Sequence, residues 1–245
     1  MTAVTMPPGQ VFSGAPLGVL LLDDVSPFIP GSVGNAGTWS VPARYRTIPG
    51  LGFRELVGPR LEELIPVVIE TAQELEREGA RLVTANCGFA IRVQEAVRSA
   101  VEVPVLLSSL LLVPFLERVL PPDRTLGVVT ASTTSLTPEL WDVAGLPDRS
   151  RVAVADLEGC PAFAAAFLDP PRALDIAAVE AETVEAATDL VQRHPEIGML
   201  LLECSELPPY AAAVQRATGL PVFDFTSMVE FFAGGLTRMP FAGLA

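Results

Sequence analysis

Two cysteines have the residue type and the position that catalysis requires. Cys87 follows the apolar run Leu82–Ala85, and Cys204 follows the apolar run 198–202. In a parallel sheet, the residue just past the carboxyl end of a strand lies at the edge where small molecules bind. A helix that begins there lowers the pKa of a thiol, so we expect both cysteines to be usable bases at neutral pH. The chemistry predicted is proton transfer on a small molecule.

The sequence similarity between the segments around the two cysteines indicates an internal duplication. Shifting the chain by 117 residues places Cys87 on Cys204 and matches further residues without a gap. The matched pairs are Ala96 with Ala213, Val97 with Val214, Ala100 with Ala217, Pro104 with Pro221, Val105 with Val222 and Phe115 with Phe232. The duplication predicts one cysteine in each of two similar units.

Apolar runs alternate with helical patterns along the chain, which is typical of an α/β protein with parallel sheets. Residues 17–22 predict a buried strand, and residues 61–75 keep helical spacing up to a C-terminal cap at Gly79. A second helix is predicted over 177–193. Between the predicted strand 17–22 and the helix 61–75, residues 23–58 form a long stretch rich in Gly, Pro and Ser, which we interpret as a binding loop.

The composition excludes several other chemistries. All 16 basic residues are Arg and the one histidine is His194, so pyridoxal phosphate aldimines and His-rich metal sites lack their essential residues. We expect no metal and no cofactor. The cysteine count is three, which predicts free thiols, and Cys160 has no counterpart in the repeat.

The charge pattern limits the partners. The net charge is −13 and the arginines are scattered, so we expect no nucleic-acid partner. The longest apolar stretches are too short to span a membrane, and no basic residue precedes Arg44, so a secretory signal is not expected. We predict a cytoplasmic protein that binds a small molecule, and leave open whether it forms a homo-oligomer.

Three short runs carry a resemblance to a known family. They are Leu82-Val83-Thr84-Ala85-Asn86-Cys87-Gly88-Phe89, Leu126-Gly127-Val128-Val129-Thr130-Ala131-Ser132 and Leu201-Leu202-Glu203-Cys204-Ser205-Glu206-Leu207. In this order and spacing they resemble the aspartate/glutamate/hydantoin racemase superfamily, which also includes arylmalonate decarboxylase and maleate isomerase. The resemblance implies two pseudo-symmetric lobes, each with a parallel-centred sheet flanked by helices, and an active site in the cleft between them. The first lobe would contain residues 1–118 and 223–245, and the second residues 119–222.

The resemblance also implies roles for particular residues. Cys87 and Cys204 would stand on opposite faces of the substrate, one removing a proton and the other returning one. The matching substrate-binding positions are Asn86, Gly88, Thr130, Ser132, Thr133 and Ser205. We add Asp23, directly after the first predicted strand, and Asn35 in the long loop. Glu203 and Glu206 flank the second cysteine and could tune its pKa.

The function predicted is a cofactor-independent racemase or epimerase acting on an amino acid, a hydantoin or a related small carboxylate. Glutamate racemases have Cys-Asn-Thr at the first site, whereas this chain has Cys87-Gly88-Phe89, which favours a less polar substrate. Two alternatives remain open. One is a decarboxylase or cis-trans isomerase that uses cysteine as acid or nucleophile. The other is a small-molecule binding protein without catalysis on the same scaffold.

Overall fold

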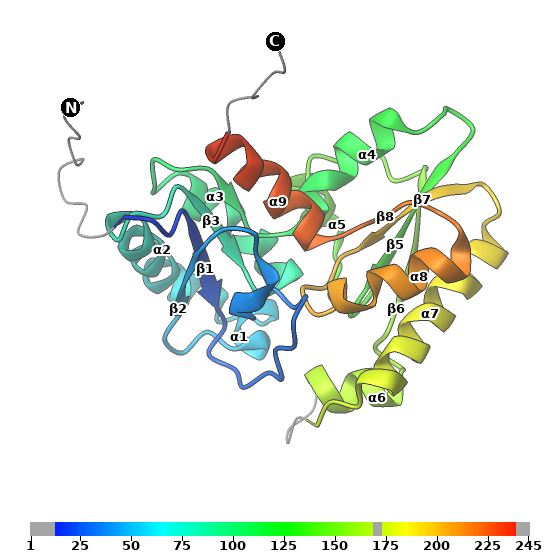
Figure 1. The fold of residues 1–245 in the computed structure, drawn as a ribbon, viewed down its shortest axis with the longest axis horizontal. Coiled ribbons are helices and arrows are strands. Elements are labelled where there is room, and N and C mark those ends of the chain that lie inside the picture. Colours follow the sequence, from blue (N-terminus) through cyan, green and yellow to red (C-terminus); the bar gives the residue numbers. More distant parts are fainter. Residues whose placement is uncertain (1–12, 169–172, 239–245) are drawn as a thin grey trace, which may run out of the picture.

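The computed structural model describes residues 13–168 and 173–238, which form two lobes joined side by side (Figure 1). Each lobe is built on a four-stranded sheet. The strands of the first are β1 (Leu17–Leu21), β2 (Ala43–Thr47), β3 (Leu82–Ala85) and β4 (Val105–Leu106). The strands of the second are β5 (Thr125–Thr130), β6 (Val152–Asp156), β7 (Ile197–Leu202) and β8 (Val222–Phe223).

The two sheets have the same topology. Their strand orders are β2-β1-β3-β4 and β6-β5-β7-β8, and all neighbouring strands are parallel. β1 therefore corresponds to β5, and β3 to β7. Because the order is the same in both lobes, the fold confirms the predicted α/β class with two similar units.

Helices flank both sheets. Those up to residue 119 are α1 (Phe53–Val57), α2 (Leu61–Arg77), α3 (Gln94–Arg98) and α4 (Val113–Val119). The later ones are α5 (Pro138–Val143), α6 (Pro161–Phe163), α7 (Ile176–Arg193), α8 (Ala211–Thr218) and α9 (Phe225–Leu236). α2 and α7 match the predicted helices, and Gly79 ends the first with a positive φ of 96°. Within the described ranges, no helix is both long and apolar enough to cross a membrane.

Short helical turns complete the part of the chain that the structure describes. Four are 3-10 helices: η1 (Ala36–Thr38), η2 (Gly88–Val93), η3 (Ser109–Leu112) and η5 (Pro208–Tyr210). A fifth, η4 (Ala164–Leu168), is π-helical and continues α6. Two of them matter for the site, because η2 begins directly after Cys87 and η4 borders the cavity described below.

The prediction of one long loop over residues 23–58 was wrong in part, because this stretch contains β2, η1 and α1. β2 is an edge strand whose residues are half-buried or exposed, so the strong apolar run of a central strand is missing. Its arginines form ion pairs with the end of α2: Arg44 lies 2.9 Å from Glu78, and Arg46 pairs with Glu78 and Glu74.

The core extends through both lobes as one large apolar cluster. A smaller cluster lies where α9 brings the end of the chain back to the first lobe. There Phe225, Met228 and Val229 pack with Leu17 and Val19 of β1. α9 thus packs against the first sheet, and the division into residues 1–118 with 223–245 and residues 119–222 stays a prediction.

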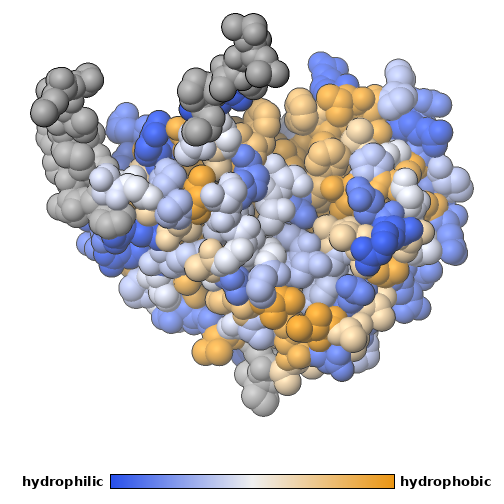
Figure 2. Space-filling model, viewed as in Figure 1, coloured by the Kyte–Doolittle hydropathy of each residue, from blue (hydrophilic) through white to orange (hydrophobic). Residues whose placement is uncertain are grey.

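The surface mixes charged and apolar residues, as the face in Figure 2 shows. Some large apolar side chains are exposed on α4 and α9, namely Phe115, Val119, Phe231 and Phe232. Two of them, Phe231 and Phe232, contact each other edge to face with ring centroids 5.6 Å apart.

Candidate active site

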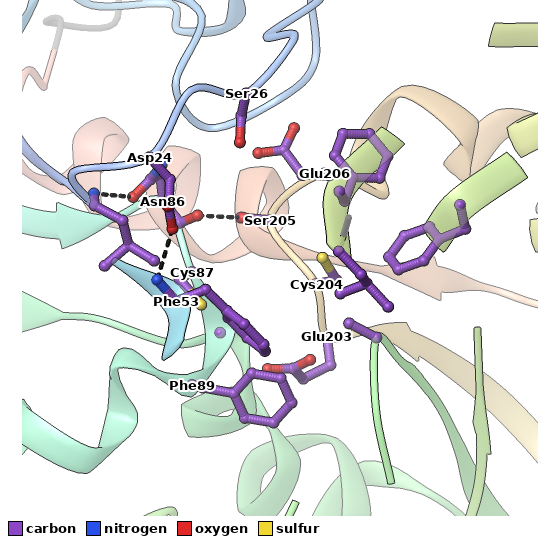
Figure 3. A pocket seen from close by; sticks show the side chains of 16 residues that line it. Asp24, Ser26, Phe53, Asn86, Cys87, Phe89, Glu203, Cys204, Ser205 and Glu206 are labelled. Carbon is purple, nitrogen blue, oxygen red and sulfur yellow. Dashed lines mark hydrogen bonds between the residues drawn. The ribbon is translucent and has the colours of Figure 1, made fainter. Parts of the chain in front are cut away.

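A small cavity lies where the carboxyl ends of β3 and β7 face each other (Figure 3). Its volume is about 60 Å³. One water needs only about 10–15 Å³, so the cavity suits a compact molecule. The residues that line it are Leu22, Asp24, Ser26, Phe53, Asn86, Cys87, Gly88, Phe89, Ala131, Phe163, Phe167, Leu168, Glu203, Cys204, Ser205 and Glu206.

Cys87 enters the cavity from the first lobe. All residues of β3 are buried, and Asn86 fixes the end of the strand by accepting a hydrogen bond from the N–H of Leu22 at 2.8 Å. Cys87 then adopts an extended conformation (φ −152°, ψ 128°) at the N-terminal cap of η2. The N–H groups of Phe89 and Ala90, in the first turn of η2, lower the pKa of the thiol.

Cys204 enters from the second lobe, directly after β7 and Glu203. It is less buried than Cys87, and the surface that it keeps lines the cavity. The next residues form a turn, and α8 begins only at Ala211. One backbone N–H group, that of Glu206, lowers the pKa of its thiol.

The expectation of low thiol pKa values was wrong. Burial is the largest influence on both thiols and raises their pKa values well above the ordinary range. The carboxyl groups of Glu203 and Glu206 raise them further, because a nearby negative charge disfavours a thiolate. The backbone N–H groups act in the opposite direction but are outweighed. Both thiols are therefore protonated at neutral pH.

Glu203 is a fully buried acid that reaches across the seam between the lobes. Its Oε2 accepts a hydrogen bond from the hydroxyl of Thr130 at 2.9 Å, and the N–H of Ala131 also donates to the carboxyl group. Its Oε1 has no hydrogen-bond partner among the described residues. Burial raises the pKa of this carboxyl group to about 7, although the two donors lower it.

Gly88 makes room for this acid. A Cβ at position 88 would collide with Oε1 of Glu203, so no larger residue fits without moving the carboxyl group. The residue after the first cysteine therefore has no side chain because an acid from the other lobe occupies that space.

Ser205 ties the lobes together. Its hydroxyl donates a 2.5 Å hydrogen bond to the carbonyl oxygen of Asn86, and its own carbonyl accepts one from the N–H of Val33 at 3.2 Å. Gly31, in the same loop as Val33, packs closely against Pro209. These contacts fix the two cysteine loops relative to each other.

Two further carboxyl groups line the cavity. Asp24 accepts a 2.6 Å hydrogen bond from the N–H of Phe53, which positions the start of α1. Figure 3 shows Glu206 and Ser26 directed toward one another on one side of the cysteines, whereas the carboxyl group of Glu203 lies on the other side, beside Phe89. The described lining contains three acids and no Arg or Lys.

Four phenyl rings supply the apolar part of the lining. Phe53 and Phe89 meet edge to face with ring centroids 5.9 Å apart. Phe163 and Phe167 lie 5.1 Å apart on α6 and η4. Phenyl rings beside carboxylates attract cations, because the ring face carries partial negative charge.

The structure brings together five of the residues assigned to the site from the sequence: Cys87, Cys204, Asn86, Gly88 and Ser205. The other five do not line the cavity. Their roles in binding stay predictions, but each has a local partner that occupies its side chain.

Of these five, Thr130 donates to Glu203, and Ser132 donates to Glu158 at 3.0 Å. The hydroxyl of Thr133 bonds Asp156. The two loop residues hold their own loops: Asp23 accepts from the N–H of Gly50 at 2.9 Å, and Asn35 caps η1 and donates to the carbonyl of Phe28.

The sequence did not assign the rings of Phe53, Phe163 and Phe167 to the site. A signal existed for the last two, since they are four residues apart, as on one helical face, soon after the end of β6. Cys160 lies outside the cavity lining, in a groove beside α7. It therefore serves as a control thiol.

Two parallel sheets with a cysteine from each at one cavity define a class of two-lobed α/β proteins with facing thiols. The chain belongs to the Asp/Glu/hydantoin racemase family, whose model matches residues 60–229. Among solved structures, unliganded arylmalonate decarboxylase superposes with a TM-score of 0.59 at 19% identity, over 91% of this chain and 92% of the other. Allantoin racemase from Pseudomonas fluorescens superposes with a TM-score of 0.58 at 16% sequence identity, over 91% of each chain. At these identities the likeness shows the fold alone.

Two curated relatives share more sequence identity with this chain than these structures do. A dimethylsulfoniopropionate lyase from Durusdinium sp. clade D is 33% identical over 252 residues, which cover 97% of this chain and 81% of the relative. Dimethylsulfoniopropionate lyase 3 from Emiliania huxleyi is 32% identical over 93% of this chain and 61% of the relative. This chain therefore spans about three fifths of the second relative's length.

Proposed function

We propose that this protein is a cofactor-independent lyase that cleaves dimethylsulfoniopropionate, with a cysteine thiolate as the base. The similarity to two proteins named as lyases of this compound supports the substrate. The observation that carries the proposal is the character of the cavity, which combines three acids and four phenyl rings with no Arg or Lys among its described lining residues. Such a lining favours a substrate that brings its own positive charge, as a sulfonium does.

The proposed reaction is an elimination that breaks a C–H bond and a C–S bond of the substrate. A thiolate takes a proton from the carbon next to the carboxylate, and the electron pair of that C–H bond forms a double bond to the neighbouring carbon. The C–S bond breaks and its electron pair leaves with sulfur. The products are dimethyl sulfide, acrylate and one proton held on the thiol, which must reach solvent before the next turnover.

The raised thiol pKa values suit this substrate. Burial and the nearby carboxyl groups keep both thiols protonated at neutral pH. A bound sulfonium offsets that negative charge and stabilises a thiolate beside it. The base therefore forms when the correct substrate is present. We assign this role to Cys87, because two backbone N–H groups lower the pKa of its thiol whereas one lowers that of Cys204.

The test is to incubate the purified protein with dimethylsulfoniopropionate and to measure dimethyl sulfide by headspace gas chromatography. Cys160→Ser is the matched control, since that thiol lies outside the cavity. We expect equal amounts of dimethyl sulfide from wild type and Cys160→Ser, and none from Cys87→Ser. Wild-type protein that releases no more than heat-denatured protein would remove the proposal.

A racemase is the second candidate, and one observation favours it. The two cysteines reach the same cavity from equivalent positions of the two lobes, as a reaction at two faces of one carbon requires. Such an enzyme exchanges the α-hydrogen of both enantiomers of its substrate with solvent. A screen of amino acids and hydantoins in deuterium oxide, followed by NMR, detects this exchange.

A further inference from the structure

We propose that Glu203 binds the substrate's carboxylate as a neutral carboxylic acid, with a proton on Oε1 that it donates as a hydrogen bond. The inference rests on the proposed function, because it identifies how this cavity holds an anionic group without a basic residue. It makes Glu203 a catalytic residue in addition to the two cysteines.

The hydrogen bonds of Glu203 place its proton. The hydroxyl of Thr130 donates to Oε2, so Oε2 acts as an acceptor. Oε1 is buried, has no partner among the described residues and faces Gly88 beside the cavity. A buried polar atom without a partner costs free energy, and a ligand that supplies the partner regains it. When the group is protonated, Oε1 is the oxygen that carries the hydrogen.

The surroundings favour the neutral form. The charged and titratable groups that share the cavity with Glu203 are Cys87, Cys204, Glu206 and Asp24, and none of them is cationic. Burial without a cation raises the pKa of Glu203 to about 7. A substrate carboxylate placed beside it raises the pKa again, since two negative charges in contact are unfavourable. Binding therefore selects the protonated form.

A neutral Glu203 also helps the thiolate to form. Its ionised form raises the pKa of both thiols, so protonation removes that penalty from the base. During proton removal, negative charge grows on the substrate's carboxylate oxygens. A hydrogen bond to these oxygens strengthens as the charge grows, so it stabilises the transition state more than the bound substrate.

The position of Glu203 also orients the substrate. Figure 3 shows Glu203 on one side of the cysteines, and Glu206 with Ser26 on the other. With its carboxylate at Glu203, the substrate directs its sulfonium group toward Glu206. The α-carbon then lies between the thiols.

The first test uses two substitutions of the same residue. In Glu203→Gln, the Thr130 hydroxyl and the Ala131 N–H hold the amide oxygen, so the NH₂ group points into the cavity and still donates. Glu203→Leu removes the donor. We expect Glu203→Leu to lower kcat/KM by about 10²–10³-fold, as loss of one such donor does, and Glu203→Gln by less than about 10-fold. Wild-type activity should fall above neutral pH, and this alkaline decrease should be absent in Glu203→Gln.

Glu158→Gln is the matched control, because Glu158 bonds Ser132 and Thr134 outside the cavity lining. It should keep wild-type kcat/KM and the wild-type pH profile. Equal losses in Glu203→Gln and Glu203→Leu would overturn the inference, because they would mean that the ionised carboxylate is required.

The second test does not depend on lyase activity. Propionate has the substrate's carboxylate but no leaving group, and its binding can be followed by calorimetry at pH 8 in buffers of different ionisation enthalpy. We expect wild type to take up close to one proton on binding and Glu203→Gln to take up none. Absence of proton uptake by wild type, or propionate binding to Glu203→Leu as tightly as to wild type, would contradict the inference. If proton uptake occurs but no dimethyl sulfide forms from the sulfonium compound, the proposed function fails while the role of Glu203 stands.

Discussion

The two cysteine loops have the same position in their sheets but different chemistry. Cys87 stands at the N-terminal cap position of η2, and two backbone N–H groups lower the pKa of its thiol. Cys204 is followed by a turn, only one backbone N–H group lowers the pKa of its thiol, and it stands between two acids of its own loop. The backbone is repeated, whereas the groups that control each thiol are not.

The residues related by the 117-residue shift show how this difference arose. Asn86 corresponds to Glu203, and both accept a hydrogen bond from the N–H that follows the first strand of their lobe, at Leu22 and Ala131. The amide ends there, whereas the longer acid extends an oxygen toward the other lobe, where Gly88 leaves space. A symmetric scaffold thus holds an asymmetric site, which suits one base and one acid better than two equal bases.

The largest expected effect separates the two thiols. Cys87→Ser should lower dimethyl sulfide release by about 10³-fold or more, because a serine hydroxyl is too weak an acid to form the base at neutral pH. Cys204→Ser should lower it by about 10-fold, through lost positioning. Initial rates by gas chromatography measure both. Equal losses in the two variants would show that the thiols are equivalent, as in a two-base racemase.

The next effect concerns stability and pH. The pKa of Glu203 is raised from 4.5 to about 7 in the folded protein, so between these values the folded state binds more protons than the unfolded state. The stability of wild type therefore falls as pH rises through this window. A change of about 2.5 pKa units corresponds to roughly 3 kcal/mol.

Glu203→Gln does not titrate, so this contribution to the pH dependence disappears. Relative to wild type, the variant should gain up to roughly 3 kcal/mol in free energy of unfolding between pH 5 and pH 8. Urea denaturation of wild type and variant at pH 5 and pH 8 measures this difference in free energy of unfolding. Asn86, the counterpart of Glu203 in the first lobe, is an amide and adds no pH dependence. Parallel pH profiles for variant and wild type would mean that Glu203 ionises normally.

Substitutions of the residues that follow the two cysteines should have smaller effects. Gly88→Ala puts a methyl group against Oε1 of Glu203, so the acid must move. We expect the free energy of unfolding to fall by about 1–3 kcal/mol and the activity to decrease as well. Ser205→Ala removes the hydrogen bond to Asn86 and should cost about 1 kcal/mol. Thermal unfolding and kcat/KM test both. A Gly88→Ala enzyme with full activity would show that the position of Glu203 is unimportant.

The smallest expected effect is that of chelation. The proposed steps use thiols, carboxyl groups and backbone N–H groups, so incubation with EDTA should leave the rate of dimethyl sulfide release unchanged. A loss that added divalent metal restores would require a different mechanism.

The sequence predicted the parts of the site that depend on the repeat. The strands before Cys87 and Cys204 and the place of both cysteines at a sheet edge follow from local pattern and topology, whereas the facing of the thiols was implied by the family resemblance. What it could not provide are contacts between distant segments. Phe53 reaches the cavity through a turn held by Asp24, and Gly88 and Glu203 meet across the seam between lobes. Residues such as Ser132 matched the family pattern, but in this chain a neighbouring acid binds its hydroxyl.

The central claim is that the cavity converts α-proton removal into loss of a sulfonium leaving group. The most direct measurement follows wild-type protein with dimethylsulfoniopropionate in deuterium oxide by NMR, recording acrylate, dimethyl sulfide and the α-hydrogens of the remaining substrate together. The account predicts acrylate and dimethyl sulfide in a one-to-one ratio. Exchange of α-hydrogens without either product, or no change in the substrate, would contradict it.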